Sequence, residues 1–212
     1  MSADIFVYLD TVQFSKNGLQ NRNQIKTASG AHWITVPVKH RFGQSIFETE
    51  IANRKTLTKH WKTIQANYSH SVGFRRWKDE LVKIFESDHR SLAELTIATT
   101  EWMLGKLVVP TRRVRASELP KTEANASKLI AGICRHLGAT NYLTGTGALA
   151  YMDLSDFSQI ECEVFVQQWN SFNYQQLNDT FVADLSTLDL LLNCPDQASE
   201  LIENAGSWKR LA

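Results

Sequence analysis

The strongest constraint on the fold is a regular alternation of strand and helix patterns in the second half of the chain. Short runs typical of strands lie at 112–119, 141–145 and 160–169. Segments with helical periodicity separate these runs, one from Thr122, which can cap it, to Gly138, and one near 147–155. Strands that alternate with helices predict right-handed βαβ units and a largely parallel sheet.

The first half of the chain and the C-terminal region carry further strand and helix patterns. The run DIFVYLD at 4–10 is nearly continuous in apolar residues, which is typical of a strand buried on both faces. Alternating and β-branched residues predict two more strands, at 32–38 and 45–51. Helices are expected after Asn53, as an N-cap, and at 74–86, 91–106 and 185–193. The predicted fold is therefore a Rossmann-like α/β domain, with a mostly parallel or mixed sheet flanked by helices, spanning 1–212.

Composition indicates the class of protein and the compartment in which it is expected. The chain has 212 residues, 43% of them hydrophobic and 21% charged, as expected for a globular protein with one substantial core. No apolar run approaches the roughly 18 residues of a membrane helix, so membrane insertion is not expected. Cysteines 134, 162 and 194 lie far apart, which favours a reducing cytoplasm. Neither a metal site nor a cofactor is predicted, apart from a nucleotide or nucleotide-sugar ligand.

Charge is strongly segregated along the sequence. Residues 11–78 contain twelve Lys or Arg and two acids, a net charge of +10, whereas the rest of the chain carries a net charge of −9. A field of one sign concentrates ligands of the opposite sign, so an anionic small-molecule substrate is expected near the basic segment. The alternative is that the acidic half packs beside the basic half and cancels its charge.

The stretch LQNRNQIKT at 19–27 is the most unusual part of the basic segment. Asparagine is unfavourable in helices and strands, and each buried polar group left unpaired costs about 1–3 kcal/mol. Asn21 and Asn23 are therefore expected either to pair with backbone in a turn or to face a polar ligand. Arg22 offers a planar fork for phosphate or carboxylate, while Lys16 and Lys26 add charge. In the alternative, Arg22 is a structural residue that meets a carboxylate of the acidic half.

Other candidate residues lie at the ends of predicted elements. Asp10 ends the first predicted strand, where ligands of parallel sheets bind, and is a candidate catalytic residue. His60 is a candidate general acid or base, with simple packing as the alternative. Lys62 belongs to a lysine stripe on the predicted helix, which is either a solvated face or a ligand contact. Thr144, Gly145 and Gly147 stand between a predicted strand and helix, where backbone N–H groups bind anions, although a tight turn also needs glycine.

Several of these segments occur in an order that resembles the WbqC-like proteins, which are bacterial proteins of surface-polysaccharide and O-antigen biosynthesis. The segments are DIFVYLDTVQFSKNGLQNRNQIKT, HWITVPVK, KHWKTIQANY, ASEL, NYLTGTGALAYMD and LSTLDLLLN. The resemblance runs from Asp4 to Trp208, and its most specific part is the block of Asp10, Gln13, Lys16 and Asn21–Asn23. It implies a cytoplasmic role in lipopolysaccharide or other surface-glycan assembly, with Gln13 among the substrate-binding residues.

The resemblance leaves the activity open. A transferase that uses a nucleotide-linked sugar is expected, with a non-catalytic module that binds an anionic glycan precursor or a partner enzyme as the alternative. Nucleic acid is less favoured, because the basic clusters at 73–78 and 112–115 lack a nucleic-acid-binding signature. Members of the family usually begin with an additional strand and turn, so about twenty residues are expected upstream of Met1. Without them, an unpartnered strand edge would favour a homo-oligomer.

Overall fold

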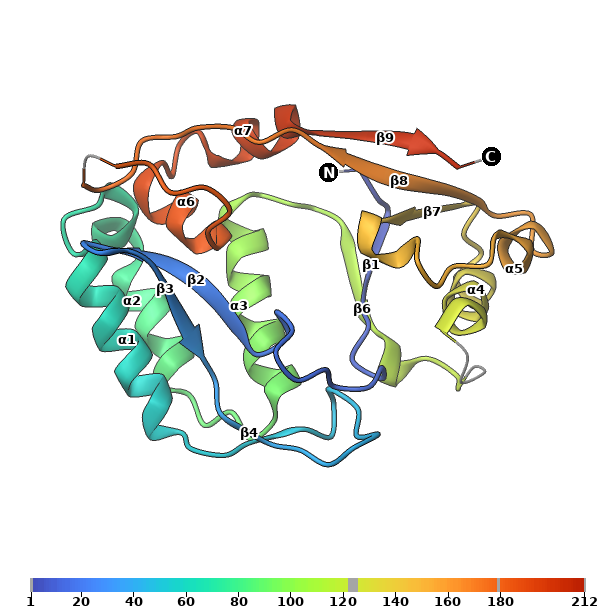
Figure 1. Cartoon of the computed structure of the whole chain (residues 1–212), viewed down its shortest axis with the longest axis horizontal. Helices are drawn as coiled ribbons and strands as arrows, with labels where there is room; N and C mark the ends of the chain where they lie inside the picture. Colours follow the sequence, from blue (N-terminus) through green and yellow to red (C-terminus); the bar gives the residue numbers. More distant parts are fainter. Residues whose placement is uncertain (1, 122–125, 179, 212) are drawn as a thin grey trace. The chain divides into compact units, whose positions relative to one another are not determined.

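The computed structural model of the chain describes residues 2–121, 126–178 and 180–211 (Figure 1). The chain forms two compact units. Unit 1 comprises Met1–Leu9, Thr111–Ser171 and Ile202–Ala212, and unit 2 comprises Asp10–Pro110 and Phe172–Leu201. Both units combine helices with strands, which confirms the predicted α/β class, while a Rossmann-like single domain stays a prediction. Of the helices described, none has the length and apolar character needed to cross a membrane.

Unit 1 holds the parallel strand pairs that the alternating pattern predicted. Strand β1 (Ile5–Tyr8) runs parallel to β6 (Arg112–Arg115), and β7 (Asn141–Thr144) runs parallel to β8 (Glu163–Trp169). A further strand, β9 (Gly206–Arg210), pairs antiparallel with β8, so β7, β8 and β9 form a mixed three-stranded sheet, separate from the β1–β6 pair. The helical elements of unit 1 are η1 (Ala116–Glu118), α4 (Ala126–Leu137), η2 (Thr146–Ala148) and α5 (Leu154–Ser158). Ala131, Cys134, Phe157, Cys162 and Val164 form its core.

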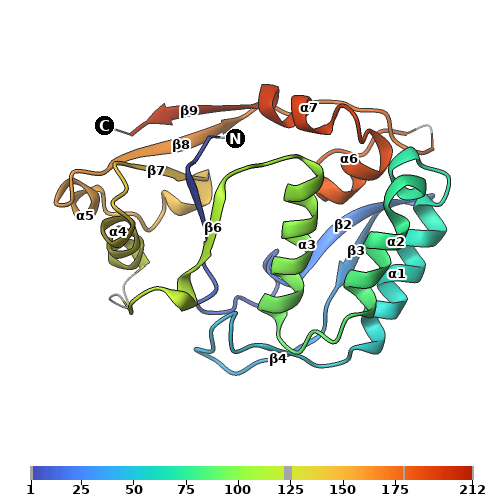
Figure 2. The same cartoon turned by 180° about the vertical axis from the view of Figure 1, so that it is seen from behind.

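Unit 2 packs helices against two small antiparallel sheets. Strand β2 (Arg22–Thr27) pairs with β3 (Gly30–Thr35), and β4 (Val38–Lys39) pairs with β5 (Glu50–Ile51). The helices are α1 (Lys55–Tyr68), α2 (Val72–Glu86), α3 (Leu92–Lys106) and α6 (Thr187–Asn193), and α7 (Ala198–Ala205) leads from unit 2 into unit 1. Both views show α1 and α2 side by side (Figures 1 and 2), and α6 packs against α2 and α3. The core includes Ile25, Leu57, Ile64, Tyr68 and Leu192.

Local signals placed most helices correctly. Ser91 accepts a hydrogen bond from the N–H of Glu94 at 3.1 Å, and the Glu94 side chain returns to the backbone of Ser91, which completes a capping box at the start of α3. Ser186 caps α6, which lies within the helix predicted at 185–193. Gly138 follows α4 with φ +66°, a conformation that favours glycine at a helix end. The proposed cap Thr122 lies outside the described residues.

Four predicted elements differ from the structure. The run at 45–51 contributes only β5, because Glu48 accepts hydrogen bonds from the N–H and hydroxyl of Ser45 at 3.0 and 2.7 Å and holds a turn. The helix near 147–155 is wrong: η2 ends at Ala148, and Asp153 caps the separate helix α5. Strand β1 is not buried on both faces, since 44% of Phe6 is exposed. Helix α1 begins one residue later than predicted, with Arg54 as its N-cap, although Asn53 accepts a hydrogen bond from the Lys55 N–H.

Candidate anion-binding site

A pocket of ≈ 460 Å³ opens in unit 2 where three segments meet. These segments are the β4–β5 ribbon, the start of α1 and the start of α3. Backbone hydrogen bonds tie them together, from Ile51 N–H to Arg90 C=O at 3.0 Å and from Ala52 N–H to Pro37 C=O at 2.8 Å. The walls of the pocket are therefore fixed by backbone rather than by long side chains alone.

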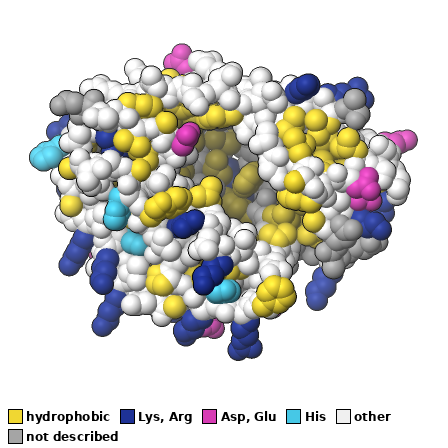
Figure 3. Space-filling model, viewed as in Figure 1, with side chains coloured by type: hydrophobic (Ala, Val, Ile, Leu, Met, Phe, Trp, Pro, Cys, Tyr) yellow, Lys and Arg dark blue, Asp and Glu magenta, His cyan; other side chains and the backbone are white. Residues whose placement is uncertain are grey.

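Cationic side chains dominate the lining of this pocket, which we call the basic pocket. Its lining residues are Lys39, Glu50, Ile51, Ala52, Asn53, Arg54, Lys55 and Arg90. Four of them carry positive charge and one carries negative charge. Lys and Arg side chains also gather along the edge of unit 2 formed by α1 and β4 (Figure 3). The lining of the pocket thus carries an excess of positive charge, which favours anions over cations.

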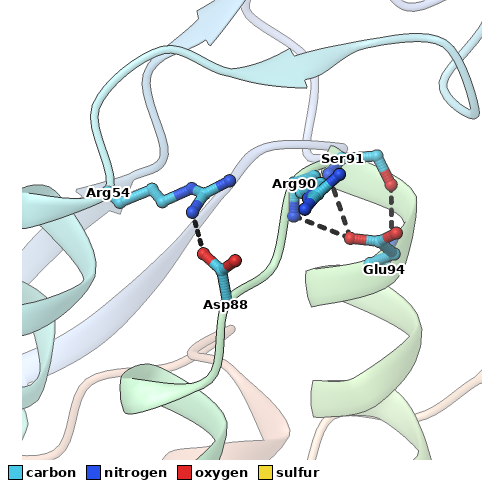
Figure 4. A network of polar contacts seen from close by, with 5 residues as sticks. All are labelled: Arg54, Asp88, Arg90, Ser91 and Glu94. Atoms are coloured by element: carbon cyan, nitrogen blue, oxygen red, sulfur yellow. Dashed lines mark hydrogen bonds and ion pairs between the residues drawn. The ribbon is translucent and has the colours of Figure 1, made fainter.

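Two of the four cations are already paired with acids. Lys39 Nζ lies 3.5 Å from Glu50 Oε2 across the β4–β5 pair, and Arg54 forms an ion pair with Asp88 (Figure 4). Both pairs are solvent-exposed, so each contributes little to stability. Within the described part of the chain, the side chains of Lys55 and Arg90 form no ion pair or hydrogen bond. Neither is neutralised by a direct ion pair with a described residue, although the charge of Arg90, after two backbone hydrogen bonds, also helps to lower the pKa of Glu94.

The two acids nearest to Arg90 in sequence, Asp88 and Glu94, already have partners, and Asp88 pairs with Arg54. The Glu94 carboxylate accepts hydrogen bonds from the backbone N–H groups of Arg90 and Ser91 at 2.7 and 3.2 Å (Figure 4). These bonds, that of Arg90 first, lower the pKa of Glu94 below its ordinary value. Helix α1 carries no acid in its first turn, so the positive end of its dipole also remains uncompensated at the pocket.

The stretch LQNRNQIKT, in contrast, is mostly a strand rather than a loop. The Asn21 Nδ2 group donates to Val36 C=O at 2.8 Å, and Val36 N–H donates to Asn21 C=O at the same distance. Asn23 Oδ1 accepts the N–H of Gln24 at 2.8 Å. Both amides thus satisfy backbone groups, as the alternative to a ligand contact predicted. Their substrate-binding role stays a prediction that these contacts do not favour.

Arg22 is held by neighbours inside unit 2. Its guanidinium lies 4.5 Å from the centre of the Trp33 ring and donates a hydrogen bond to the backbone carbonyl of Asn17. Its Nε is buried and has no hydrogen-bond partner among the described residues. The structural alternative therefore gains support, although the neighbours of Arg22 are an aromatic ring and a carbonyl rather than the expected carboxylate.

Comparison with known proteins identifies the family. Residues 1–201 match the WbqC-like protein family. The chain belongs to this family. An uncharacterised protein of Mycobacterium tuberculosis, Rv1507c, is 32% identical to the WbqC-like chain over 203 residues, which cover 94% of the chain and 87% of the relative. No solved structure matches the chain. The expected family resemblance is thus confirmed.

Lys26 of this WbqC-like protein belongs to a buried polar network. Its backbone N–H donates to the Tyr68 hydroxyl at 2.8 Å, and its Nζ donates to the carbonyls of Asn178 and Thr180. Only 4% of Lys26 is exposed. Since its ammonium already holds two backbone carbonyls, these contacts favour an architectural role, and its substrate-binding role stays a prediction.

His60 lies on the buried side of α1, with 9% of its surface exposed. Burial lowers its pKa most, a hydrogen bond with the Thr35 backbone opposes this shift, and the charge of His32 adds to the lowering. A neutral, buried imidazole fits the packing alternative better than an acid–base role. Catalysis by His60 stays a prediction.

The remaining predicted residues of unit 2 lie apart from the basic pocket lining. Asp10 is buried, with 3% exposed, and its backbone carbonyl accepts the N–H of Phe47 at 2.8 Å. Gln13 forms an isolated β-bridge with Ser45. The side chains of Lys16 and Lys62 are exposed. None of the four lines the basic pocket, and their catalytic or binding roles stay predictions.

The glycine turn of unit 1 lacks the helix on which its predicted role depended. Thr144 is buried at the end of β7, and Gly145 and Gly147 are exposed at η2, which spans only Thr146–Ala148. A Cβ atom added at either glycine would contact nothing within 4 Å, and neither has a positive φ. The glycines are therefore not required by sterics, and anion binding there stays a prediction.

The sequence did not point to two residues of the basic pocket, Arg54 and Arg90, and of these Arg90 carries the proposed site. The charge count placed Arg54 in the basic segment, whereas Arg90 lies beyond 11–78. Arg90 reaches the pocket because β5 pairs with the start of α3 through an isolated bridge between Glu50 and Ser91. No local pattern predicts a bridge of this kind.

Proposed function

We propose that this WbqC-like protein acts in cytoplasmic surface-glycan biosynthesis as a transferase, and that its basic pocket binds the phosphate groups of a nucleotide-linked sugar or a similar activated anion. Family membership supports the glycan role. The carrying observation is that Lys55 and Arg90 line one pocket and that neither forms a direct ion pair among the described residues.

The chemistry of such a transfer explains why a cationic pocket is useful. When a sugar leaves a nucleotide, negative charge develops on the departing diphosphate, and fixed positive groups stabilise that charge. Arg90 offers a planar fork for two phosphate oxygens, and Lys55 adds a point charge. Held by backbone bonds, the pocket walls need little rearrangement on binding.

A non-catalytic binding module is the second candidate, and one observation favours it. Glu50 is the single carboxylate in the lining, and it is paired with Lys39. The pocket lining therefore holds an anion better than it activates a nucleophile.

Ligand binding tests both candidates. We expect nucleoside diphosphates and their hexose conjugates to raise the thermal midpoint of the protein, because a ligand of the native state stabilises it by mass action. Arg90→Gln should weaken this binding about tenfold or more in calorimetry, from the loss of a charged hydrogen-bond donor. Arg75→Gln, at an exposed arginine of α2, is the matched control and should bind as wild type.

Turnover then separates the two candidates. Release of free nucleoside diphosphate in the presence of an acceptor glycan supports the transferase, whereas binding without release supports the module. If Arg90→Gln binds as tightly as wild type, the basic pocket is not the site.

A further inference from the structure

The most exposed large hydrophobic side chain of unit 2 sits at the tip of a tight turn. Phe42 is 98% exposed. The N–H of Gln44 donates to Arg41 C=O at 3.2 Å, and Gly43 at the third position has φ +81°, as in a type II turn. The Gln44 side chain also accepts the Arg41 N–H at 2.9 Å, which ties the turn a second time.

The turn is anchored to the body of unit 2. Phe14 N–H donates to Gln44 C=O at 2.8 Å, and Ile46 N–H donates to Val12 C=O at 3.0 Å. The Gln44 side chain donates to Glu48 C=O at 2.6 Å. These bonds fix the backbone after the tip, and the pairing of β4 with β5 fixes it before the tip. Phe42 is therefore held in solvent and does not fold back onto the protein.

Two cationic side chains precede the exposed ring. These are Lys39 and Arg41, and the Arg41 side chain has no ion pair within the described residues. The ring of His40 packs against Phe14 at 5.2 Å, and Lys39 faces Glu50. Glu48, the acid that follows the turn, accepts a hydrogen bond from the Ser45 hydroxyl, which lowers the pKa of Glu48 and keeps it charged. Figure 3 shows a hydrophobic side chain among Lys, Arg and His side chains at this edge of unit 2.

We propose that the Phe42 turn docks the protein on the surface of an anionic lipid bilayer. Phe42 enters the headgroup region, while Arg41 and Lys39 lie at the level of the lipid phosphates. A fluid bilayer closes around a single projecting ring, whereas a stable protein interface needs a broad complementary surface. The turn offers one rigid projection with charge around it, which fits the bilayer.

Docking would also determine where the basic pocket opens. Lys39 lines that pocket and also leads into the turn, so the pocket would open close to the membrane surface. This inference goes beyond the proposed function and does not depend on it, because binding to lipid requires no activated sugar.

Vesicle flotation tests the proposal with the full chain. We expect wild-type protein to float with vesicles of phosphatidylcholine mixed with phosphatidylglycerol, and to remain unbound with phosphatidylcholine alone or at high salt. Phe42→Ser should weaken binding to the mixed vesicles about tenfold or more, since the ring no longer leaves water. Arg41→Glu should weaken it as well. The control Val108→Ser changes another exposed apolar residue, 80% accessible and remote in sequence, and should bind as wild type.

Two results would overturn the proposal. One is that wild-type protein binds neither kind of vesicle. If Phe42→Ser then also alters the oligomeric state, a partner copy is the occupant of the turn. The other is that Phe42→Ser and Val108→Ser bind mixed vesicles equally well. Unchanged thermal midpoints of all variants ensure that lost binding does not reflect unfolding.

Discussion

The hydroxyl of Tyr68 donates a hydrogen bond to Asp189 at 2.5 Å and so joins the end of α1 to α6 inside unit 2. The Tyr174 hydroxyl donates to the other carboxylate oxygen at 2.7 Å. Asp189 is fully buried, at 0% exposure. Burying a carboxylate costs free energy unless hydrogen-bond donors satisfy it. The hydrogen bonds from these two tyrosines therefore offset the cost of burying Asp189 in the core.

Removing one donor should destabilise the fold. We expect Tyr68→Phe to lower the free energy of unfolding by about 1–3 kcal/mol, because Asp189 and the Lys26 N–H each lose a partner. Denaturant titration measures the change. Tyr151→Phe, at a residue 59% exposed in unit 1, should leave it unaltered. Equal stability of the two variants would contradict the structural role of the network.

The same network should shape stability at alkaline pH. Burial, followed by the charge of Asp189, raises the pKa of Tyr68 above its ordinary value of 10.0. The folded state therefore keeps a proton that the unfolded chain releases, so stability holds below pH 10 and falls as the pH rises beyond it. In Tyr68→Phe this alkaline decline should be shallower, as followed by denaturant titration at several pH values. An identical slope in both proteins would show that Tyr68 does not contribute.

His60 should affect the stability of the fold at acidic rather than alkaline pH. Its pKa is lowered by burial from an ordinary value of 6.5, so the unfolded chain binds a proton more readily than the folded protein. The contribution of His60 to stability is present above pH 6.5 and is lost as the pH falls through its lowered pKa. His60→Gln should flatten this acid decline, whereas His70→Gln, at an exposed histidine, should not. Thermal melts between neutral and acidic pH distinguish the two.

Two helical glycines offer a matched pair for packing. A Cβ atom at Gly73 of α2 would lie 2.3 Å from the carbonyl oxygen of Leu191, whereas one at Gly105 of α3 would meet nothing within 4 Å. We expect Gly73→Ala to destabilise by about 1–3 kcal/mol through overpacking. Gly105→Ala should stabilise by roughly 0.5–1 kcal/mol, since alanine loses less backbone entropy. A tolerated Gly73→Ala would mean that α2 and α6 pack less closely than described.

Arg22→Lys separates a structural from a ligand-binding role. Lysine lacks the planar group that stacks on Trp33 and reaches Asn17, so we expect a loss of about 1 kcal/mol in stability. Nucleotide-sugar affinity should stay unchanged in calorimetry, with Arg75→Lys as the control. A tenfold or greater loss of affinity at unchanged stability would instead return Arg22 to the ligand site.

The helices of this protein were largely readable from the sequence, because their signals are local. Apolar residues such as Leu57 and Ile64 recur at helical spacing, and Ser91 and Ser186 stand where a cap is needed. The parallel strands of unit 1 followed from the alternation of patterns. Strand β9 and helix α7 were missed.

Only the tertiary structure decided whether the amide-rich stretch forms a strand and where the basic pocket lies. Arg22–Thr27 becomes a strand despite its asparagine because Ile25 is fully buried and the Lys26 N–H donates a hydrogen bond to the hydroxyl of Tyr68, 42 residues away. Arg90 joins the pocket through pairing between β5 and the start of α3. The sequence by itself determined the helices and the excess of positive charge, since both depend on neighbouring residues. Pairing between distant segments depends on which partners satisfy buried polar groups, and only the folded chain settles that.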